Sequence, residues 1–113
     1  MDDSSFMRKR IAGAVERAGH QVVGQARDGQ EGIEMYRSLK PDMVIMDVTM
    51  RGMDGIEAVR NIRQVDGEAR VVFMSLVSDE RIQQEAMKLG ALAWLGKDEH
   101  GRLIDLLNNT GAR

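Results

Sequence analysis

Several apolar segments of this sequence end in a polar residue or are followed closely by one. Asp47 ends the run MVIMD, Ser75 ends RVVFMS, and Lys97 stands two residues beyond ALAWL. The adjacent acids Asp2 and Asp3 precede the first segment with helical character. If the apolar runs are parallel strands, their carboxyl ends share one edge of a sheet, and functional groups gather beyond that edge. We therefore expect three carboxylates, a hydroxyl and an ammonium in one crevice.

This set of groups suits phosphoryl chemistry. Crowded carboxylates repel each other, and a hard divalent cation with oxygen ligands removes that penalty. Mg²⁺ fits a site with few carboxylates that also meets phosphate oxygens. One carboxylate can then attack phosphorus to give an aspartyl phosphate. Lys97 and the metal would neutralise the phosphoryl oxygens, and the hydroxyl of Ser75 would donate to one of them.

Each of these residues, taken alone, also has an ordinary structural interpretation. An aspartate at a strand end is commonly a helix cap or a turn residue. A serine after a strand is usually a turn residue, and a single lysine is usually solvated. Only their joint placement at successive strand ends favours the functional interpretation.

Helices and buried strands alternate along the chain. Apolar spacing and capping residues such as Asp28, Asp54 and Ser78 predict helices. The apolar runs are continuous, as expected for strands buried on both faces of a parallel sheet. The expected helices are 5–18, 28–39, one opening at 54, 78–89 and 99–108, and the expected strands are 20–26, 43–47, 70–75 and 91–95. This order predicts βα crossover units and a sheet with helices on both faces.

Composition limits the class of protein. The 113 residues are expected to form one domain, 1–113, with 42% hydrophobic and 30% charged residues, as in ordinary globular proteins. No apolar run reaches the roughly 20 residues that span a bilayer. The net charge of −2 and the scattered basic residues argue against nucleic-acid binding. Cysteine is absent, so thiolate metal sites are excluded and a cytoplasmic location is the default expectation.

The motifs resemble those of response regulator receiver domains, and DDSSFMR most resembles the chemotaxis, CheY-like branch. The segments DDSSFMRK, PDMVIMDVTMRGMDGIEAV, VVFMS and GALAWLGK occur in the order of that family and cover essentially the whole chain. The resemblance implies an α/β fold, namely a three-layer α/β/α flavodoxin-like parallel sheet. In that family a buried strand precedes the acidic pair at the centre of a 2-1-3-4-5 sheet. This sequence lacks it.

The resemblance also implies residue roles. Asp47 would be the phospho-acceptor, and Asp2, Asp3, Asp47 and the backbone carbonyl of Thr49 would hold Mg²⁺. Ser75 and Lys97 would contact the phosphoryl group. Ser75 and Trp94 would form the switch that remodels the face where partners dock.

The implied function is two-component signal transduction. A histidine kinase or a phosphotransfer protein would donate a phosphoryl group to Asp47, and a downstream protein target, plausibly in chemotaxis or motility, would receive the signal. The chain would be no enzyme beyond accepting this group on itself. The alternative is a degenerate receiver that serves as an interaction or dimerisation module, favoured by the absent strand, by Leu76 after the switch serine and by Asp98 after the lysine. A phosphatase of the haloacid-dehalogenase type is less favoured, since Asp47-Val48-Thr49 lacks its second acid.

The absent strand leaves three structural outcomes open. The segments HQVVGQA and MVIMD could close against each other, another chain could donate an element, or the natural protein could be longer. We expect a homo-oligomer or strand exchange at the vacated sheet edge, since unpaired strand edges favour pairing with another chain.

Overall fold

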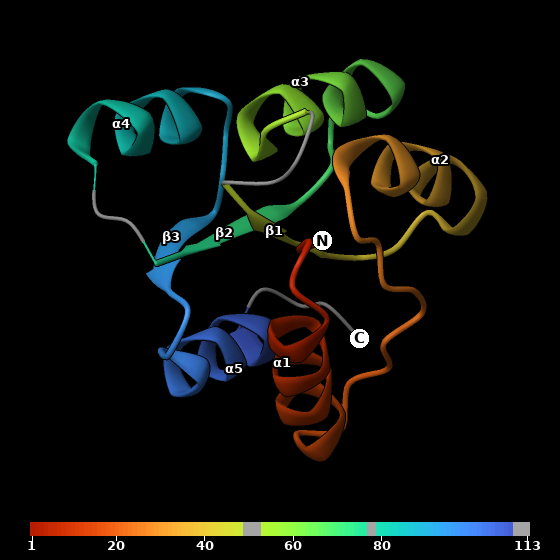
Figure 1. Ribbon diagram of the computed structural model, residues 1–113, viewed down its shortest axis with the longest axis vertical. Helices are drawn as coiled ribbons and strands as arrows, with labels where there is room; N and C mark the ends of the chain where they lie inside the picture. The colour runs from red at the N-terminus through yellow and green to blue at the C-terminus, as the bar shows by residue number, and fades with distance from the viewer. Residues whose placement is uncertain (49–52, 77–78, 110–113) are drawn as a thin grey trace.

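The computed structural model describes residues 1–48, 53–76 and 79–109. Helices and strands alternate through most of this range (Figure 1). The elements are α1 Ser5–Arg17, α2 Gly29–Leu39, β1 Val44–Asp47, α3 Gly55–Val65, β2 Val71–Ser75, α4 Glu80–Lys88, β3 Ala93–Gly96 and α5 His100–Asn109.

The three strands form a parallel sheet in the order β1-β2-β3. Met46 pairs with Phe73, which pairs with Trp94 on the next strand. Helices α2, α3 and α4 cover one face of the sheet, and α1 and α5 cover the other (Figure 1). This arrangement confirms the predicted three-layer α/β/α fold, and the described residues hold no strand before α1.

Each face of the sheet carries its own hydrophobic core. Met46 and Phe73 point toward α2, α3 and α4, where they pack with Val59 and Ile62. Val72 and Met74 point the other way, against apolar residues of α1 and α5. All five residues of β2 are buried, as expected for the central strand.

Short polar side chains set the helix starts. Ser4, Asp28 and Asp54 each accept a hydrogen bond from the amide three residues further on, which satisfies an otherwise unpaired donor. The cap of α4 is Asp79, whose carboxylate accepts from the amides of Arg81 and Ile82. The prediction of Ser78 as this cap was therefore wrong by one residue, and Ser78 itself lies outside the described residues.

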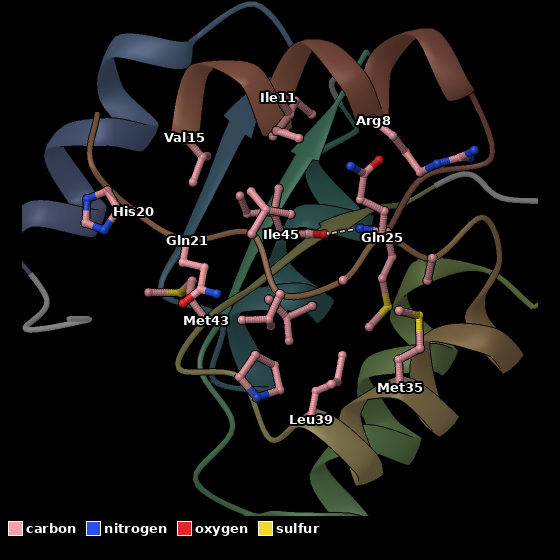
Figure 2. A pocket seen from close by; sticks show the side chains of 18 of the residues that line it. Arg8, Ile11, Val15, His20, Gln21, Gln25, Met35, Leu39, Met43 and Ile45 are labelled. Carbon is pink, nitrogen blue, oxygen red and sulfur yellow. Dashed lines mark hydrogen bonds between the residues drawn. The ribbon is translucent and has the colours of Figure 1, made fainter. Parts of the chain in front are cut away.

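The predicted strand at 20–26 is wrong, because the segment between α1 and α2 has no strand structure. A strand needs a partner for its backbone groups, and a cavity separates this segment from β1 (Figure 2). Residues 21 and 23–25 are exposed, while Ala26 is buried and its carbonyl accepts from the amide of Asp2. The two segments therefore do not close against each other.

Candidate functional site

The carboxyl ends of the three strands meet as the sequence predicted. Asp47 ends β1, Ser75 ends β2, and Lys97 follows the last residue of β3. Ser75 pairs in register with Gly96, and the amide of Lys97 donates to the carbonyl of Ser75 at 3.1 Å. Parallel pairing thus fixes these three residues at one edge of the sheet.

The N-terminal backbone brings the acidic pair to the same edge. The amide of Asp47 donates to the carbonyl of Met1 at 2.8 Å, and the amide of Asp2 donates to the carbonyl of Ala26 at 3.0 Å. The guanidinium of Arg8 donates to the carbonyl of Asp2 at 2.6 Å. Two of these bonds hold the backbone amide and carbonyl of Asp2, and the third holds Met1 directly before it, so backbone contacts bring the acidic pair to this edge.

Three carboxylates converge here. One oxygen each from Asp2, Asp3 and Asp47 lies within 4.8 Å of the others. Asp2 and Asp47 are only 3% and 6% exposed, whereas Asp3 is exposed. Two buried anions and one solvated anion at such short range require a nearby positive charge.

Lys97 supplies that charge. Its Nζ lies 2.8 Å from Oδ2 of Asp2 and 3.1 Å from Oδ2 of Asp47, and the lysine is 6% exposed. Burial alone would lower the pKa of Lys97, but its contacts with Asp2 and Asp47 and their charges outweigh this effect. The pKa of Lys97 is therefore raised, and the side chain stays cationic.

The donor set also fits a magnesium ion. Oδ2 of Asp2 is buried, and its close partner is the ammonium of Lys97 at 2.8 Å. A buried carboxylate oxygen without a donor is costly unless a cation approaches it. Carboxylate oxygens from a buried pair and an exposed neighbour are ligands that Mg²⁺ accepts, with water completing its coordination.

Other predicted site residues are placed as follows. Ser75 is buried at the end of β2, directly after Met74, which pairs in register with Asp47. The ring of Trp94, on the neighbouring strand, lies 5.9 Å from that of Phe73 and is partly buried. Leu76 is 79% exposed to solvent. Thr49 lies outside the described residues.

Two residues escaped the sequence-based prediction. Arg8 is one of the scattered basic residues of the sequence, and only its hydrogen bond to the carbonyl of Asp2 reveals its place beside the site. A Cβ at Gly55 would lie 2.1 Å from the carbonyl oxygen of Asp47, so only glycine lets α3 approach the end of β1 this closely. The signal for Gly55 was its position directly after the capping Asp54.

Comparisons with known proteins agree with this geometry. Residues 1–108 match the model of the response regulator receiver domain. The chain is 37% identical over 109 residues to the chemotaxis protein CheY of Thermotoga maritima, covering 96% of this chain and 91% of that protein. It is 34% identical to CheY of Bacillus subtilis, with coverage of 97% and 92%.

Solved structures show the same likeness. A chain of the CheX-CheY-BeF3-Mg+2 complex from Borrelia burgdorferi matches with a TM-score of 0.88 at 29% identity, covering 95% of this chain and 83% of that chain. The response regulator domain of CheB from Thermotoga maritima matches with a TM-score of 0.82 at 31% identity, with coverage of 96% and 87%. The chain therefore belongs to the response regulator receiver domain family.

Proposed function

We propose that this receiver domain accepts a phosphoryl group on Asp47 in a magnesium-dependent reaction. The observation that carries the proposal is the cluster of Asp2, Asp3 and Asp47 around the ammonium of Lys97 at the carboxyl edge of the sheet. A site built only for stability would not need a third carboxylate beside an already paired anion.

The covalent step is an exchange of one bond to phosphorus for another. A carboxylate oxygen of Asp47 forms the new P–O bond while the bond between phosphorus and the imidazole nitrogen of a phosphohistidine breaks. The electron pair of that bond leaves with the imidazole, which takes up a proton. A small phosphodonor such as acetyl phosphate would serve in the same way, with acetate as the leaving group.

The residues around Asp47 have separate tasks. When bound, Mg²⁺ supplies positive charge to the phosphoryl oxygens. Asp2, Asp3 and Asp47 would hold the metal, together with the carbonyl of Thr49. Lys97 moves from its ion pair with Asp47 to the phosphoryl oxygens, and the hydroxyl of Ser75 donates to one of them.

The signal would pass to a protein partner through Ser75 and Trp94. Ser75 ends β2, the strand between those of the acceptor and of Trp94, so a shift of the Ser75 hydroxyl would change the packing around the indole. The phosphoryl donor would be a histidine kinase or a phosphotransfer protein. A chemotaxis or motility protein is the favoured target, because the relatives include CheY proteins, one of them solved in complex with CheX.

Intact-mass spectrometry tests this proposal. Incubation with acetyl phosphate and Mg²⁺ should add the mass of one phosphoryl group to the protein. The adduct should disappear in the Asp47→Asn variant and when a chelator replaces Mg²⁺. No adduct on the folded wild-type protein would refute the proposal and favour a degenerate receiver that acts as an interaction module.

A further inference from the structure

The lysine of the candidate site stands in a tight turn between β3 and α5. Gly96 ends β3, Lys97 and Asp98 form the middle of the turn, and Glu99 directly precedes the first residue of α5. The amide of Glu99 donates to the carbonyl of Gly96 at 3.0 Å, which closes the turn through the main chain. This turn therefore carries the residue whose ammonium pairs with two buried carboxylates.

The carboxylate of Glu99 folds back over the start of the same turn. Its Oε1 accepts a hydrogen bond from the amide of Gly96 at 2.7 Å. Both backbone groups of Gly96 are thus bonded to Glu99, one through the side chain and the other through the main chain. A Cβ at Gly96 would lie only 3.2 Å from Oε1 of Glu99, so glycine leaves the carboxylate room to approach the backbone.

Arg102 holds the other oxygen of this carboxylate. Oε2 of Glu99 lies 2.8 Å from a guanidinium nitrogen of Arg102, one turn further along α5. The carbonyl of Glu99 accepts from the amide of Leu103 at 3.1 Å and so begins the hydrogen bonding of α5. The amide of Gly96 and the charge of Arg102 hold the pKa of Glu99 below its usual range. Glu99 is therefore a carboxylate at neutral pH, and it joins β3, the turn and α5.

The ammonium of Lys97 depends on the backbone of this turn for its position. A lysine side chain is a flexible stem, so the place where it starts determines where its charge can lie. On the side of the sheet, the amide of Lys97 is fixed by its bond to the carbonyl of Ser75. The sequence places no proline at position 97 or 98, so no ring restricts the backbone angles there. Hydrogen bonds must restrict them, and Glu99 contributes one from its amide and one through its carboxylate.

We propose that Glu99 is a positioning residue for Lys97, because its carboxylate closes the turn from which the lysine ammonium reaches Asp2 and Asp47. Glu99 acts through the backbone of the lysine and not on the phosphoryl group. The inference rests on the proposed function, in which Lys97 meets the phosphoryl oxygens. A displacement of about 1 Å in such a group slows a reaction on the order of 100-fold, so opening the turn should be visible in the rate.

Acetylation of lysines reports the position of Lys97 without any phosphoryl chemistry. The probe is the N-hydroxysuccinimide ester of acetic acid, which reacts with accessible, neutral amines, and peptide mass mapping gives the rate at each lysine. Lys97 is 6% exposed, whereas Lys88 is exposed. In the wild type, Lys97 should react at least about tenfold more slowly than Lys88, because its ion pairs keep it protonated and burial excludes the reagent. Glu99→Ala should remove most of this protection.

Two further variants show which contact of Glu99 is responsible. Glu99→Gln keeps an oxygen that accepts from the amide of Gly96 but loses the charge, so Lys97 should remain protected. Glu80→Ala is the matched control, since it removes an exposed glutamate from the first turn of α4, and it should leave the protection unchanged. Circular dichroism establishes that the variants are folded.

The rate of phosphorylation shows whether Glu99 acts through Lys97. With acetyl phosphate and Mg²⁺, Glu99→Ala should gain the phosphoryl mass at least about tenfold more slowly than the wild type. Added to Lys97→Met, the same change should alter the rate by less than about twofold, because the group that Glu99 positions is already absent. A residue that only stabilised the fold would slow the reaction equally in both backgrounds.

Three results would overturn the inference. The first is unchanged protection of Lys97 in folded Glu99→Ala, and the second is an equal loss of protection in Glu99→Gln. The third is an equal slowing of phosphorylation by Glu99→Ala with and without Lys97. A wild-type protein that takes up no phosphoryl group would refute the proposed function instead, and the acetylation rates alone would then support or overturn the role of Glu99.

Discussion

The ammonium of Lys97 lies 2.8 Å from the carboxylate of Asp2, slightly closer than the 3.1 Å that separates it from Asp47. The lysine thus neutralises the acidic pair as well as the acceptor. A buried charge that loses its partner is strongly destabilising, whereas a new cation in the same place compensates for it. Lys97 and a bound metal ion would therefore both supply positive charge to the same carboxylates.

Replacing Lys97 should make the protein depend on magnesium for stability. Lys97→Met preserves the approximate length of the side chain but removes its charge. Asp2 and Asp47 are then buried without their cation. We expect the free energy of unfolding to fall by about 3 kcal/mol in the absence of metal. Mg²⁺ should raise the free energy of unfolding of this variant more than that of the wild type, because a ligand that binds only the folded state stabilises that state.

Urea unfolding followed by circular dichroism, with and without Mg²⁺, measures this effect. Lys88→Met is the control, because Lys88 is exposed at the end of α4 and should contribute little. Equal stability of Lys97→Met and the wild type in a chelator would contradict the assigned role of Lys97 as a counter-cation.

Gly55 should be essential for the position of Asp47. A methyl group there would lie 2.1 Å from the carbonyl oxygen of Asp47, so Gly55→Ala must displace α3 or the end of β1. We expect a loss of about 1–3 kcal/mol in thermal or urea unfolding, and slower phosphorylation of Asp47. Gly101→Ala is the matched control, since nothing lies within 4 Å of its added Cβ. Because alanine favours helices, Gly101→Ala should stabilise α5. Equal effects of the two variants on stability would contradict the close approach of α3 to the end of β1.

The amino group of Met1 should make stability depend on pH. Burial lowers its pKa from 8.0 to about 6, against the attraction of Asp2 and Asp47. Between these values the unfolded chain binds more protons than the folded one, so the free energy of unfolding should rise as pH increases from 6 to 8. The full difference between the two pKa values corresponds to about 3 kcal/mol in the free energy of unfolding.

Acetylation of the amino terminus provides the control for this titration. It removes the charge but keeps an N–H that can donate to the carbonyl of Ile45, the acceptor of the amino group. In urea unfolding, the free energy of unfolding of the acetylated protein should therefore rise less between pH 6 and 8 than that of the unmodified protein. Both proteins carry the same histidines, so the comparison isolates the amino group. The same slope in both proteins would assign the pH dependence to other groups.

The sequence predicted the strand-end positions of Asp47, Ser75 and Lys97, because continuous apolar runs and parallel pairing determine which residues reach one edge. It also predicted the caps of α2 and α3, where an aspartate stands three residues before a glutamate. The segment 20–26 was misassigned because its pattern fits a strand, while strand formation depends on a neighbour that pattern alone does not reveal. The backbone hydrogen bonds of Met1 were equally unpredictable, since they involve backbone atoms that any residue carries.

Trp94 should report phosphorylation of Asp47. It is the single tryptophan of the chain, its ring lies 5.9 Å from that of Phe73, and Phe73 pairs with it across two adjacent strands. If Ser75 moves toward the phosphoryl group, space opens next to β3 and the partly exposed indole can pack more deeply. Acetyl phosphate with Mg²⁺ should then shift the fluorescence maximum to shorter wavelength, because the indole leaves water.

Two variants separate this switch from simple metal binding. Asp47→Asn should abolish the shift because no phosphoryl group is added. Ser75→Ala keeps the acceptor and should still gain the phosphoryl mass, but its shift should be reduced because the hydroxyl that couples the acceptor to the indole is missing. A full shift in Ser75→Ala would mean that the indole responds to the charge at Asp47 directly, so that the two strand ends are coupled by electrostatics rather than by packing.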